Sequence, residues 1–397
     1  MSSRVNLLAP EVRANPYPVY AELRRNAPVS QVDPGGLWAV TRYADAAAVL
    51  KNPQLYASEG FRQAYRPAWF SDYPLADSML VMDPPHHTRL RALVNRAFGA
   101  SVMTRLEPRI RQLAEQTVAE LPTGRSVDFA EAWSVRIPLA VIAELIGLSP
   151  SVYPQLKRWA DLFGTFTGIG PNDTERQELM RNTVAEARQH FEQVLEERRR
   201  EPREDLVSDL LKARVEGEAL SSAELMGFMF LLVVAGMETT VHLMNHSAIR
   251  LRDEPELMAK LRADRSLIPR FVDEMLRYEP PVHGVFRMTT QEVELGGVRL
   301  PKGARLLVML CSANRDEAQF PNPDRFDLER PGPQNLPFGQ GIHYCLGAQL
   351  ARLEGRLGTE ALVTRFSRLS PGDGPVRWNS SLVVRGPLSL PLVAHPA

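Results

Sequence analysis

Hydrophobic positions recur at helical spacing along much of the chain, and this pattern predicts a mainly helical fold. The periodicity is clearest at residues 104–121, 174–200, 222–250 and 347–366. Shorter strand-like stretches lie at 37–41, 293–299 and 304–310, and Pro301-Lys302-Gly303 separates the last two. We therefore expect mainly α structure with small β-sheets.

One of these helical stretches is strongly apolar between Met226 and Met237. Twelve residues at a rise of ~1.5 Å each span roughly 18 Å, well short of a bilayer core of ~30 Å. A buried helix fits this stretch better than a membrane span. Ser221 and Glu224 have the spacing of a capping box, so we expect the helix to begin there.

The segment Ala235-Gly236-Met237-Glu238-Thr239-Thr240 interrupts the apolar pattern. Ala235 and Gly236 remove bulk from the helix, so that a neighbouring group can lie against its backbone. Glu238 and Thr239 add an acid and a hydroxyl. The alternative is a solvated turn in which Thr240 bonds back to a carbonyl.

Composition narrows the class of protein. The 397 residues carry no net charge and 44% of them are hydrophobic, which allows a large core and gives no reason to expect nucleic-acid binding. No linker, repeat or low-complexity run divides the chain, so we expect a single domain over 1–397. Residues 1–25 are polar and broken by prolines, unlike a targeting segment, which favours a cytoplasmic protein without a membrane anchor.

Cys345 lies in a glycine-rich loop, and the only other cysteine is Cys311. Two cysteines exclude a disulfide framework and a four-cysteine zinc site. The residues after Gly347 favour a helix, whose N-terminus would stabilise a Cys345 thiolate, and Phe338 can shield the sulfur. The alternative is an ordinary turn that holds a buried cysteine.

The string Phe338-Gly339-x-Gly341-x-His343-x-Cys345-Leu346-Gly347 resembles the haem-binding signature of the cytochrome P450 family. The resemblance covers nearly the whole chain. It implies the cytochrome P450 fold, in which a long central helix lies over the haem and the cysteine loop lies on the proximal side of the haem. It also implies that Cys345 ligates the iron of haem b. The haem would be held non-covalently, because the sequence contains no Cys-x-x-Cys-His.

Three other motifs resemble the same family. By this resemblance Ala235 and Gly236 lie against the haem, and Glu238 and Thr239 deliver protons to dioxygen. The pair Glu274 and Arg277 would be worth under ~1 kcal/mol on a surface. In the family the matching pair is buried and forms a structural network, which Arg325 would complete here.

The fourth motif is Asp83-Pro84-Pro85-His86-His87-Thr88-Arg89-Leu90-Arg91. Two prolines precede an expected helix, on which His87 and Arg91 share a face. Without the resemblance to this family, the segment would be interpreted as the basic, solvated first turn of a helix. The resemblance makes the two residues partners of the haem propionates, together with Arg287 and His343. His86 stands where an acidic residue is usual. Phe338, Gly339 and Gly347 complete the expected haem contacts.

The function implied is monooxygenation of a small, fairly bulky apolar substrate by O2. No dinucleotide fingerprint or flavin domain is visible, so electrons would come from an external ferredoxin or flavodoxin with its reductase. Arg96 and Arg352 are candidates for docking that partner, or else ordinary surface charge. We expect a monomer.

Position in the family assigns the substrate pocket to residues that suit a terpenoid, steroid or polyketide. Any aromatic among them is as well explained by the core, and the imidazole of His283 can face a substrate oxygen or the interior of the fold. The assigned residues are Phe61, Trp69, Phe70, Tyr73, Leu231, Leu232, Val282, His283, Val285, Phe286, Leu382 and Val383.

Two alternatives stay open at this point. Arg62 and Arg66 allow a carboxylate-bearing substrate such as a fatty acid, and a peroxide-driven or otherwise atypical family member would need no redox partner. A non-catalytic haem sensor or carrier would not need Glu238 and Thr239, and their presence argues against it.

Overall fold

The computed structural model describes residues 4–331 and 335–397, which form two compact units. Unit 1 comprises Met1–Ala57, Ala114–Ser134 and Thr239–Ala397. Unit 2 comprises Ser58–Leu113 and Val135–Glu238. Each unit is assembled from separate stretches of sequence, so neither is a continuous segment of the chain.

Unit 1 contains a five-stranded sheet with the strand order β1-β2-β8-β5-β3. β8 runs parallel to β2 and antiparallel to β5, with Arg287 opposite Leu306. The sheet places Arg287 at a fixed register position. The strands are β1 (Val29–Val32), β2 (Leu37–Val40), β3 (Tyr56–Ala57), β5 (Val285–Thr289) and β8 (Arg305–Val308).

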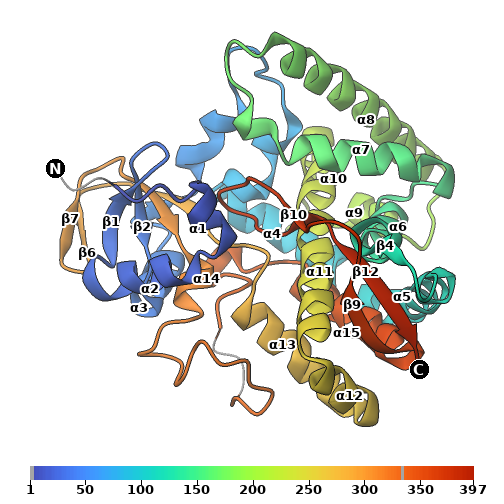
Figure 1. Ribbon diagram of the computed structural model, residues 1–397. Helices are drawn as coiled ribbons and strands as arrows, with labels where there is room; N and C mark the ends of the chain where they lie inside the picture. Colours follow the sequence, from blue (N-terminus) through green and yellow to red (C-terminus); the bar gives the residue numbers. More distant parts are fainter. Residues whose placement is uncertain (1–3, 332–334) are drawn as a thin grey trace. The chain divides into compact units, whose positions relative to one another are not determined.

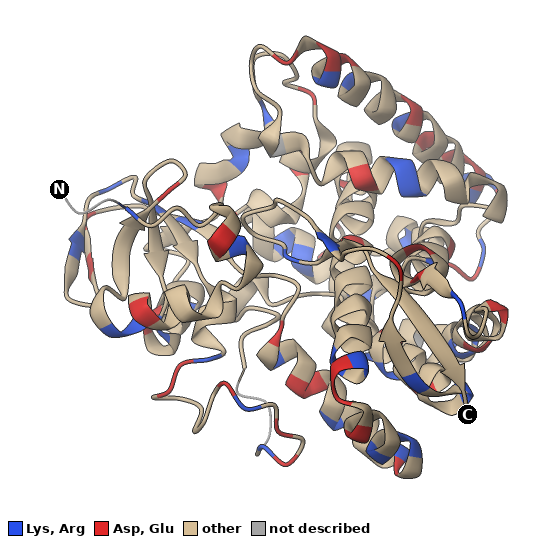
Figure 2. Cartoon of the chain, viewed as in Figure 1, with Lys and Arg blue, Asp and Glu red and all other residues tan. Residues whose placement is uncertain are grey.

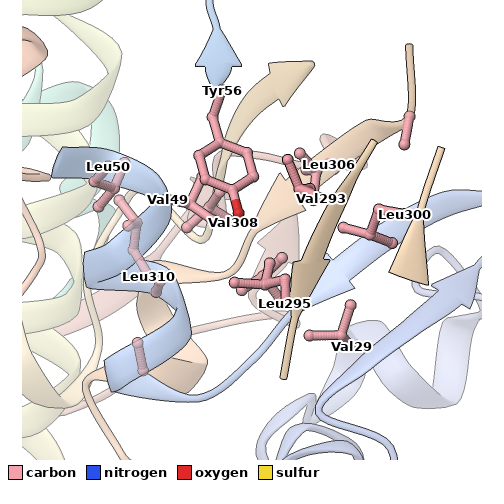
Figure 3. Close-up of a cluster of buried hydrophobic side chains, with 14 of the residues drawn as sticks. Val29, Val49, Leu50, Tyr56, Val293, Leu295, Leu300, Leu306, Val308 and Leu310 are labelled. Carbon is pink, nitrogen blue, oxygen red and sulfur yellow. The ribbon is translucent and has the colours of Figure 1, made fainter. Parts of the chain in front are cut away.

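A buried apolar cluster holds this sheet against helix α3 (Tyr43–Lys51). Figure 3 shows Val49 and Leu50 of the helix beside Val308 and Tyr56 of the strands. Val308 and Val49 are fully buried. Burying one such side chain stabilises the fold by ~1.5–3 kcal/mol, so the cluster is a major source of the sheet's stability.

The remaining strands of unit 1 form three small sheets. The stretch 293–299 was predicted as one strand, and this is wrong. It is a hairpin of β6 and β7, because Gly296 and Gly297 have φ of 57° and 78° and form the turn. These strands are β4 (Ser126–Asp128), β6 (Val293–Leu295), β7 (Val298–Leu300), β9 (Phe366–Pro371), β10 (Arg377–Trp378), β11 (Pro387–Ser389) and β12 (Pro391–Pro396).

The other regular elements of unit 1 are helices (Figure 1). The helix predicted over 347–366 is confirmed as α15. The helices are α1 (Pro10–Ala14), α2 (Tyr17–Asn26), η4 (Ala130–Ser134), α11 (Glu238–Asp253), α12 (Pro255–Ala263), η7 (Arg265–Leu267), α13 (Ile268–Tyr278), α14 (Leu310–Ala313), η8 (Gly341–His343) and α15 (Ala348–Arg365).

Unit 2 is helical. The helix predicted over 174–200 is confirmed as α8, whose first turn is capped by the Asp173 carboxylate. Acidic and basic residues follow one another along α8, as expected of a solvated face (Figure 2). Helix α5 (Ala100–Glu120) is shared, because its residues from Ala114 on belong to unit 1. The other helices are η1 (Glu59–Tyr65), η2 (Pro74–Asp77), η3 (Met79–Val81), α4 (His86–Ala97), α6 (Arg136–Ile146), η5 (Pro150–Val152), α7 (Tyr153–Phe163), η6 (Phe166–Gly168), α8 (Thr174–Arg200), α9 (Leu206–Lys212) and α10 (Ser222–Gly236).

The apolar helix begins where the sequence predicts. Ser221 and Glu224 form the complete capping box. The helical stretch is longer than the apolar run, because it continues to Asp253 and is interrupted only at Met237, between α10 and α11. By length and composition the stretch could cross a membrane, but 67% of its most apolar window is buried inside the protein. The same burial is found in core helices of soluble proteins.

Candidate functional site

The Cys345 loop of unit 1 is closed by its own backbone. The Cys345 amide donates a hydrogen bond to the Phe338 carbonyl at 3.0 Å, which joins the two ends of the motif. Gly347 is the N-cap of α15, two residues after the cysteine. The unpaired amides and the positive end of this helix therefore follow Cys345 closely in the chain, a position that favours a thiolate.

The three glycines of the loop differ in what they do. A Cβ on Gly341 would lie 2.2 Å from the Leu50 carbonyl oxygen, so this glycine lets the loop pack against the end of α3. Gly339 has a φ of 70°, and a Cβ there or on Gly347 would meet no atom within 4 Å. The space beside these two glycines is open, so a neighbouring group such as haem can approach the loop there.

Two further residues that the sequence assigned to haem lie in unit 1. Arg287 is 8% exposed on β5, and one of its Nη atoms donates to the Phe286 carbonyl at 2.7 Å. His343 ends the short helix η8 and is partly exposed. The ring of Phe338 lies under the Arg352 guanidinium at 4.6 Å. Arg352 also donates to Asp273 at 2.7 Å, so it is part of the loop's support rather than a free surface cation.

Glu274 and Arg277 form a buried ion pair on α13. They are 5% and 1% exposed, and two hydrogen bonds of 2.7 and 2.8 Å join them. Arg325 joins through its backbone carbonyl, which accepts from Arg277 at 3.1 Å, while its side chain is exposed. The side chain that completes the network is Arg330, 3.3 Å from Glu274. The sequence prediction is therefore wrong for the Arg325 side chain. The path of the loop brings the side chain of Arg330, five residues further on, to Glu274 instead.

Unit 2 carries the other motif residues except Thr239, which is the first residue of the last segment of unit 1. Ala235 is exposed although residues 225–231 of the same helix are buried. A Cβ on Gly236 would lie 2.4 Å from Cδ1 of Ile142, so the group against this glycine is a side chain of α6. Glu238 Oε2 lies close to Gly164, where an added Cβ would be 3.2 Å away. The acid and Thr239 both follow the interruption at Met237 and are partly exposed.

Helix α4 begins at His86, directly after the two prolines, as predicted. His87 is 2% exposed and Arg91 is partly exposed. The carboxylate of Asp83 accepts hydrogen bonds from the amides of Ser58 and Glu59 at 3.1 and 2.8 Å. This bracing fixes the segment that enters α4.

Three of the predicted pocket aromatics of unit 2 lie around one further ring. Tyr73 is 1% exposed and stacks on Phe166 with ring centres 3.9 Å apart. Trp69 and Phe70 lie 5.3 and 6.3 Å from the same ring. Their common partner Phe166 was not predicted, and no local pattern marks it. Phe61 and Leu232 are partly exposed, and Leu231 is 8% exposed.

The predicted pocket residues of unit 1 lie against its core. His283 is 2% exposed, and its Nδ1 lies 3.3 Å from the Tyr20 hydroxyl, so its side chain faces the interior rather than a substrate. Burial holds the pKa of His283 well below its usual value. The other five are partly buried and pack against two apolar clusters; they are Val282, Val285, Phe286, Leu382 and Val383.

Comparisons with known proteins agree with these motifs. The family model for cytochrome P450 matches residues 152–390. The cytochrome P450 monooxygenase PikC of Streptomyces venezuelae is 36% identical over 397 residues, which cover 97% of this chain and 92% of that protein. The vitamin D(3) 25-hydroxylase of Pseudonocardia autotrophica is 36% identical over 390 residues, covering 96% and 94%.

Solved structures give the same result. The structure of cytochrome P450 CYP109Q5 from Chondromyces apiculatus matches with a TM-score of 0.92 and 40% sequence identity, covering 100% of both chains. The mainly helical fold with small sheets, the cysteine loop and these relatives lead to one conclusion. The chain belongs to the cytochrome P450 family and is a monooxygenase.

Proposed function

We propose that this protein is a haem-thiolate monooxygenase that inserts one oxygen atom from O2 into a C–H bond of a bulky apolar molecule. The observation that carries the proposal is the Cys345 loop, which has its amide bonded to Phe338 and open space beside Gly339 and Gly347. When bound, haem b would supply the oxygen activation that no side chain can supply.

The chain's own residues would hold the haem and its charge. In unit 1, Cys345 would be the iron ligand, with its thiolate stabilised by the N-terminus of α15. Arg287 and His343 would neutralise the propionates. From unit 2 the proposal takes His87 and Arg91 for the same task, together with Ala235 as a haem contact. The Cβ side of Gly236 is occupied by Ile142, so this glycine is not included. Guanidinium groups suit carboxylates because they donate two parallel hydrogen bonds.

Glu238 and Thr239 would hold and move protons. The carboxylate of Glu238 can exchange a proton with solvent, because it is partly exposed, and the hydroxyl of Thr239 can donate one. Met237 separates α10 from α11, so both side chains lie in the first turn of α11. Their role would be to deliver protons to dioxygen in the order that the reaction requires.

The proposed substrate is a terpenoid, steroid or polyketide-like molecule. A relative named as a vitamin D(3) 25-hydroxylase supports a large apolar substrate. A fatty acid is the weaker candidate. Its carboxylate would need a free cation, and Arg62 and Arg66 each donate to Asp77 Oδ1 at 2.7 Å. These ion pairs leave neither arginine uncommitted.

The remaining expectations belong to the same proposal. Electrons would come from a separate ferredoxin or flavodoxin with its reductase. The protein would act as a single domain, a monomer and a soluble cytoplasmic enzyme. Turnover with an NADPH-fed redox chain, compared with turnover on peroxide alone, tests the electron source. Activity with peroxide only would contradict an external redox partner.

The ligand assignment is tested with the two cysteines. Cys345→Ser should abolish the red-shifted Soret band of the reduced, CO-treated protein. Cys311→Ser is the matched control and should keep that band. Cys311 is buried, donates to the His283 carbonyl at 3.1 Å, and burial raises its pKa to about 12, so it stays a thiol. An unchanged band in Cys345→Ser would overturn the assignment.

The proton-delivery assignment is tested with two adjacent threonines. Thr239→Ala should retain haem but release more peroxide, which is measured as product formed per NADPH consumed. Thr240→Ala removes a buried hydroxyl one position away and should leave this ratio close to that of the unaltered enzyme. Equal ratios in both variants would contradict the role of Thr239.

A further inference from the structure

One short segment of unit 2 carries three of the residues that the sequence assigned to the substrate pocket. Residues 66–73 connect η1 with η2, consist of turns, and include Trp69, Phe70 and Tyr73. The Tyr73 side chain is 1% exposed and stacks on Phe166. A side chain buried to this degree cannot contact a substrate. Tyr73 can therefore line the pocket only in a second arrangement of the segment.

Two arginines of α8 hold the segment in the arrangement that the structure shows. Nη2 of Arg188 donates to the Asp72 carbonyl at 3.1 Å and to the Asp72 carboxylate at 3.0 Å. Nη1 of Arg181 donates to the Trp69 carbonyl at 3.3 Å. Arg181 and Arg188 are seven residues apart, which places them on the same face of the helix. This face of α8 therefore fastens the main chain of the segment at two points.

The fastening is weak and open to solvent. The Asp72 side chain is 81% exposed and that of Arg188 is 32% exposed. Exposed ion pairs of this kind contribute little to stability and are screened by salt. The buried hydroxyl of Tyr73 has no hydrogen-bond partner among the described residues, and an unmet polar group disfavours the arrangement that buries it. Small changes at Arg188 should therefore shift the balance between the two arrangements.

We propose that Arg188, assisted by Arg181, is a positioning residue whose bonds to Asp72 latch this segment, and that release of the latch admits the substrate. The inference rests on the proposed function, in which the substrate is a bulky apolar molecule. Salt weakens the latch, so such a substrate should enter faster at higher ionic strength. An uncharged molecule has no charge of its own for salt to screen, so this dependence reports on the latch.

Hydrogen exchange of the holoenzyme measures release of the latch directly. The amides of Phe70 and Ala76 donate to the carbonyls of Pro67 and Tyr73 at 2.9 and 3.0 Å, so they exchange when the segment opens. Arg188→Gln should speed exchange of a peptide that covers residues 66–77 by roughly 2- to 5-fold. Unchanged exchange in this variant overturns the inference.

Arg158→Gln is the matched control. It removes the same charge from α7, where Arg158 pairs with Glu186 of α8 at 2.6 Å and is 53% exposed. This pair is an exposed ion pair of α8 that does not involve the segment. The control should therefore exchange residues 66–77 at the rate of the unaltered protein. Equal acceleration in both variants would mean that α8 is loosened generally, which refutes a latch at Arg188.

Entry is measured by stopped flow with clotrimazole, an apolar azole that is uncharged at about pH 8 and shifts the Soret band when it binds haem iron. Raising NaCl from 0.05 to 0.5 M shortens the Debye length from roughly 14 to roughly 4 Å. The association rate constant of the unaltered protein and of Arg158→Gln should rise by roughly 2- to 5-fold. Arg188→Gln should already be fast at low salt and respond little. Salt-independent association in the unaltered protein contradicts the proposal.

A charge exchange separates the latch from other effects of the substitution. Arg188→Glu should speed entry, and adding Asp72→Lys restores an ion pair with its charges exchanged, so entry at low salt should become slow again. Failure of this rescue overturns the ion-pair latch. Failure of the proposed function has a different signature, because clotrimazole would then leave the Soret band unshifted in every variant. A normal shift with equal rates in all variants overturns the latch alone.

Discussion

Glu354 offers a quantitative test of how burial controls the stability of unit 1. It lies on α15, nine residues after Cys345, and is 1% exposed. Its Oε2 atom has no hydrogen-bond partner among the described residues. Burial raises the pKa of Glu354 from 4.5 to about 8, so the folded protein holds this carboxyl as a neutral acid at neutral pH.

The sign and size of the effect follow from proton linkage. Because the folded pKa is above the unfolded pKa, the folded state binds more protons between pH ~4.5 and ~8. Stability therefore falls as pH rises through this window, by ~1.36 kcal/mol for each pH unit, and the loss is complete above pH ~8. Between pH 6 and pH 9 the contribution of Glu354 amounts to a loss of roughly 3 kcal/mol.

Glu354→Gln keeps the shape of the side chain and removes the titration. In urea unfolding, the free energy of unfolding of the unaltered protein should fall between pH 6 and pH 9 by roughly 3 kcal/mol more than that of the variant. Glu360→Gln, a partly exposed position on the same helix, is the control and should run parallel to the unaltered protein. An unchanged difference for Glu354→Gln would refute the argument, because the carboxyl would then be ionised or hydrated in the folded state.

Three further changes test the packing around the site. Arg277→Leu should destabilise the protein by ~3–5 kcal/mol in urea unfolding, because it leaves the Glu274 charge buried; a loss under ~1 kcal/mol would contradict the burial. Arg330→Ala should lower the free energy of unfolding by ~1–2 kcal/mol, because it removes a contact with Glu274. Arg325→Ala should lower it by under ~0.5 kcal/mol, because that side chain is exposed. The opposite order would show that Arg325 completes the network. Gly236→Ala should cost ~1–3 kcal/mol through its clash with Ile142, and adding Ile142→Val should recover part of the loss; no recovery would place the strain elsewhere.

The elements that the sequence predicted correctly rest on short-range interactions. The capping box at Ser221, the start of α4 after Pro85, and the extent of α8 are each decided within a turn or two of helix. The strand predicted over 293–299 failed for a local reason as well. Gly296 and Gly297 with positive φ form a turn in the middle of it.

The candidate site was predictable where its chemistry lies in short motifs. The loop around Cys345 and the motif at Glu238 identify the family from the chain alone, and the comparisons confirm that family. Predictions about single contacts were less secure. The sequence pointed to Arg325, whereas the side chain that reaches Glu274 is Arg330, because only the folded path of the loop decides which guanidinium arrives.

The sequence by itself determined the mainly helical fold, the cysteine loop and the reaction class, because these depend on residue types at fixed spacings. Tertiary structure alone decided which group lies against Gly236, that His283 faces the interior, and that Trp69, Phe70 and Tyr73 share Phe166. These contacts join residues far apart in the chain. Their burial and spacing depend on how whole helices pack, and no local pattern of polar and apolar residues encodes that.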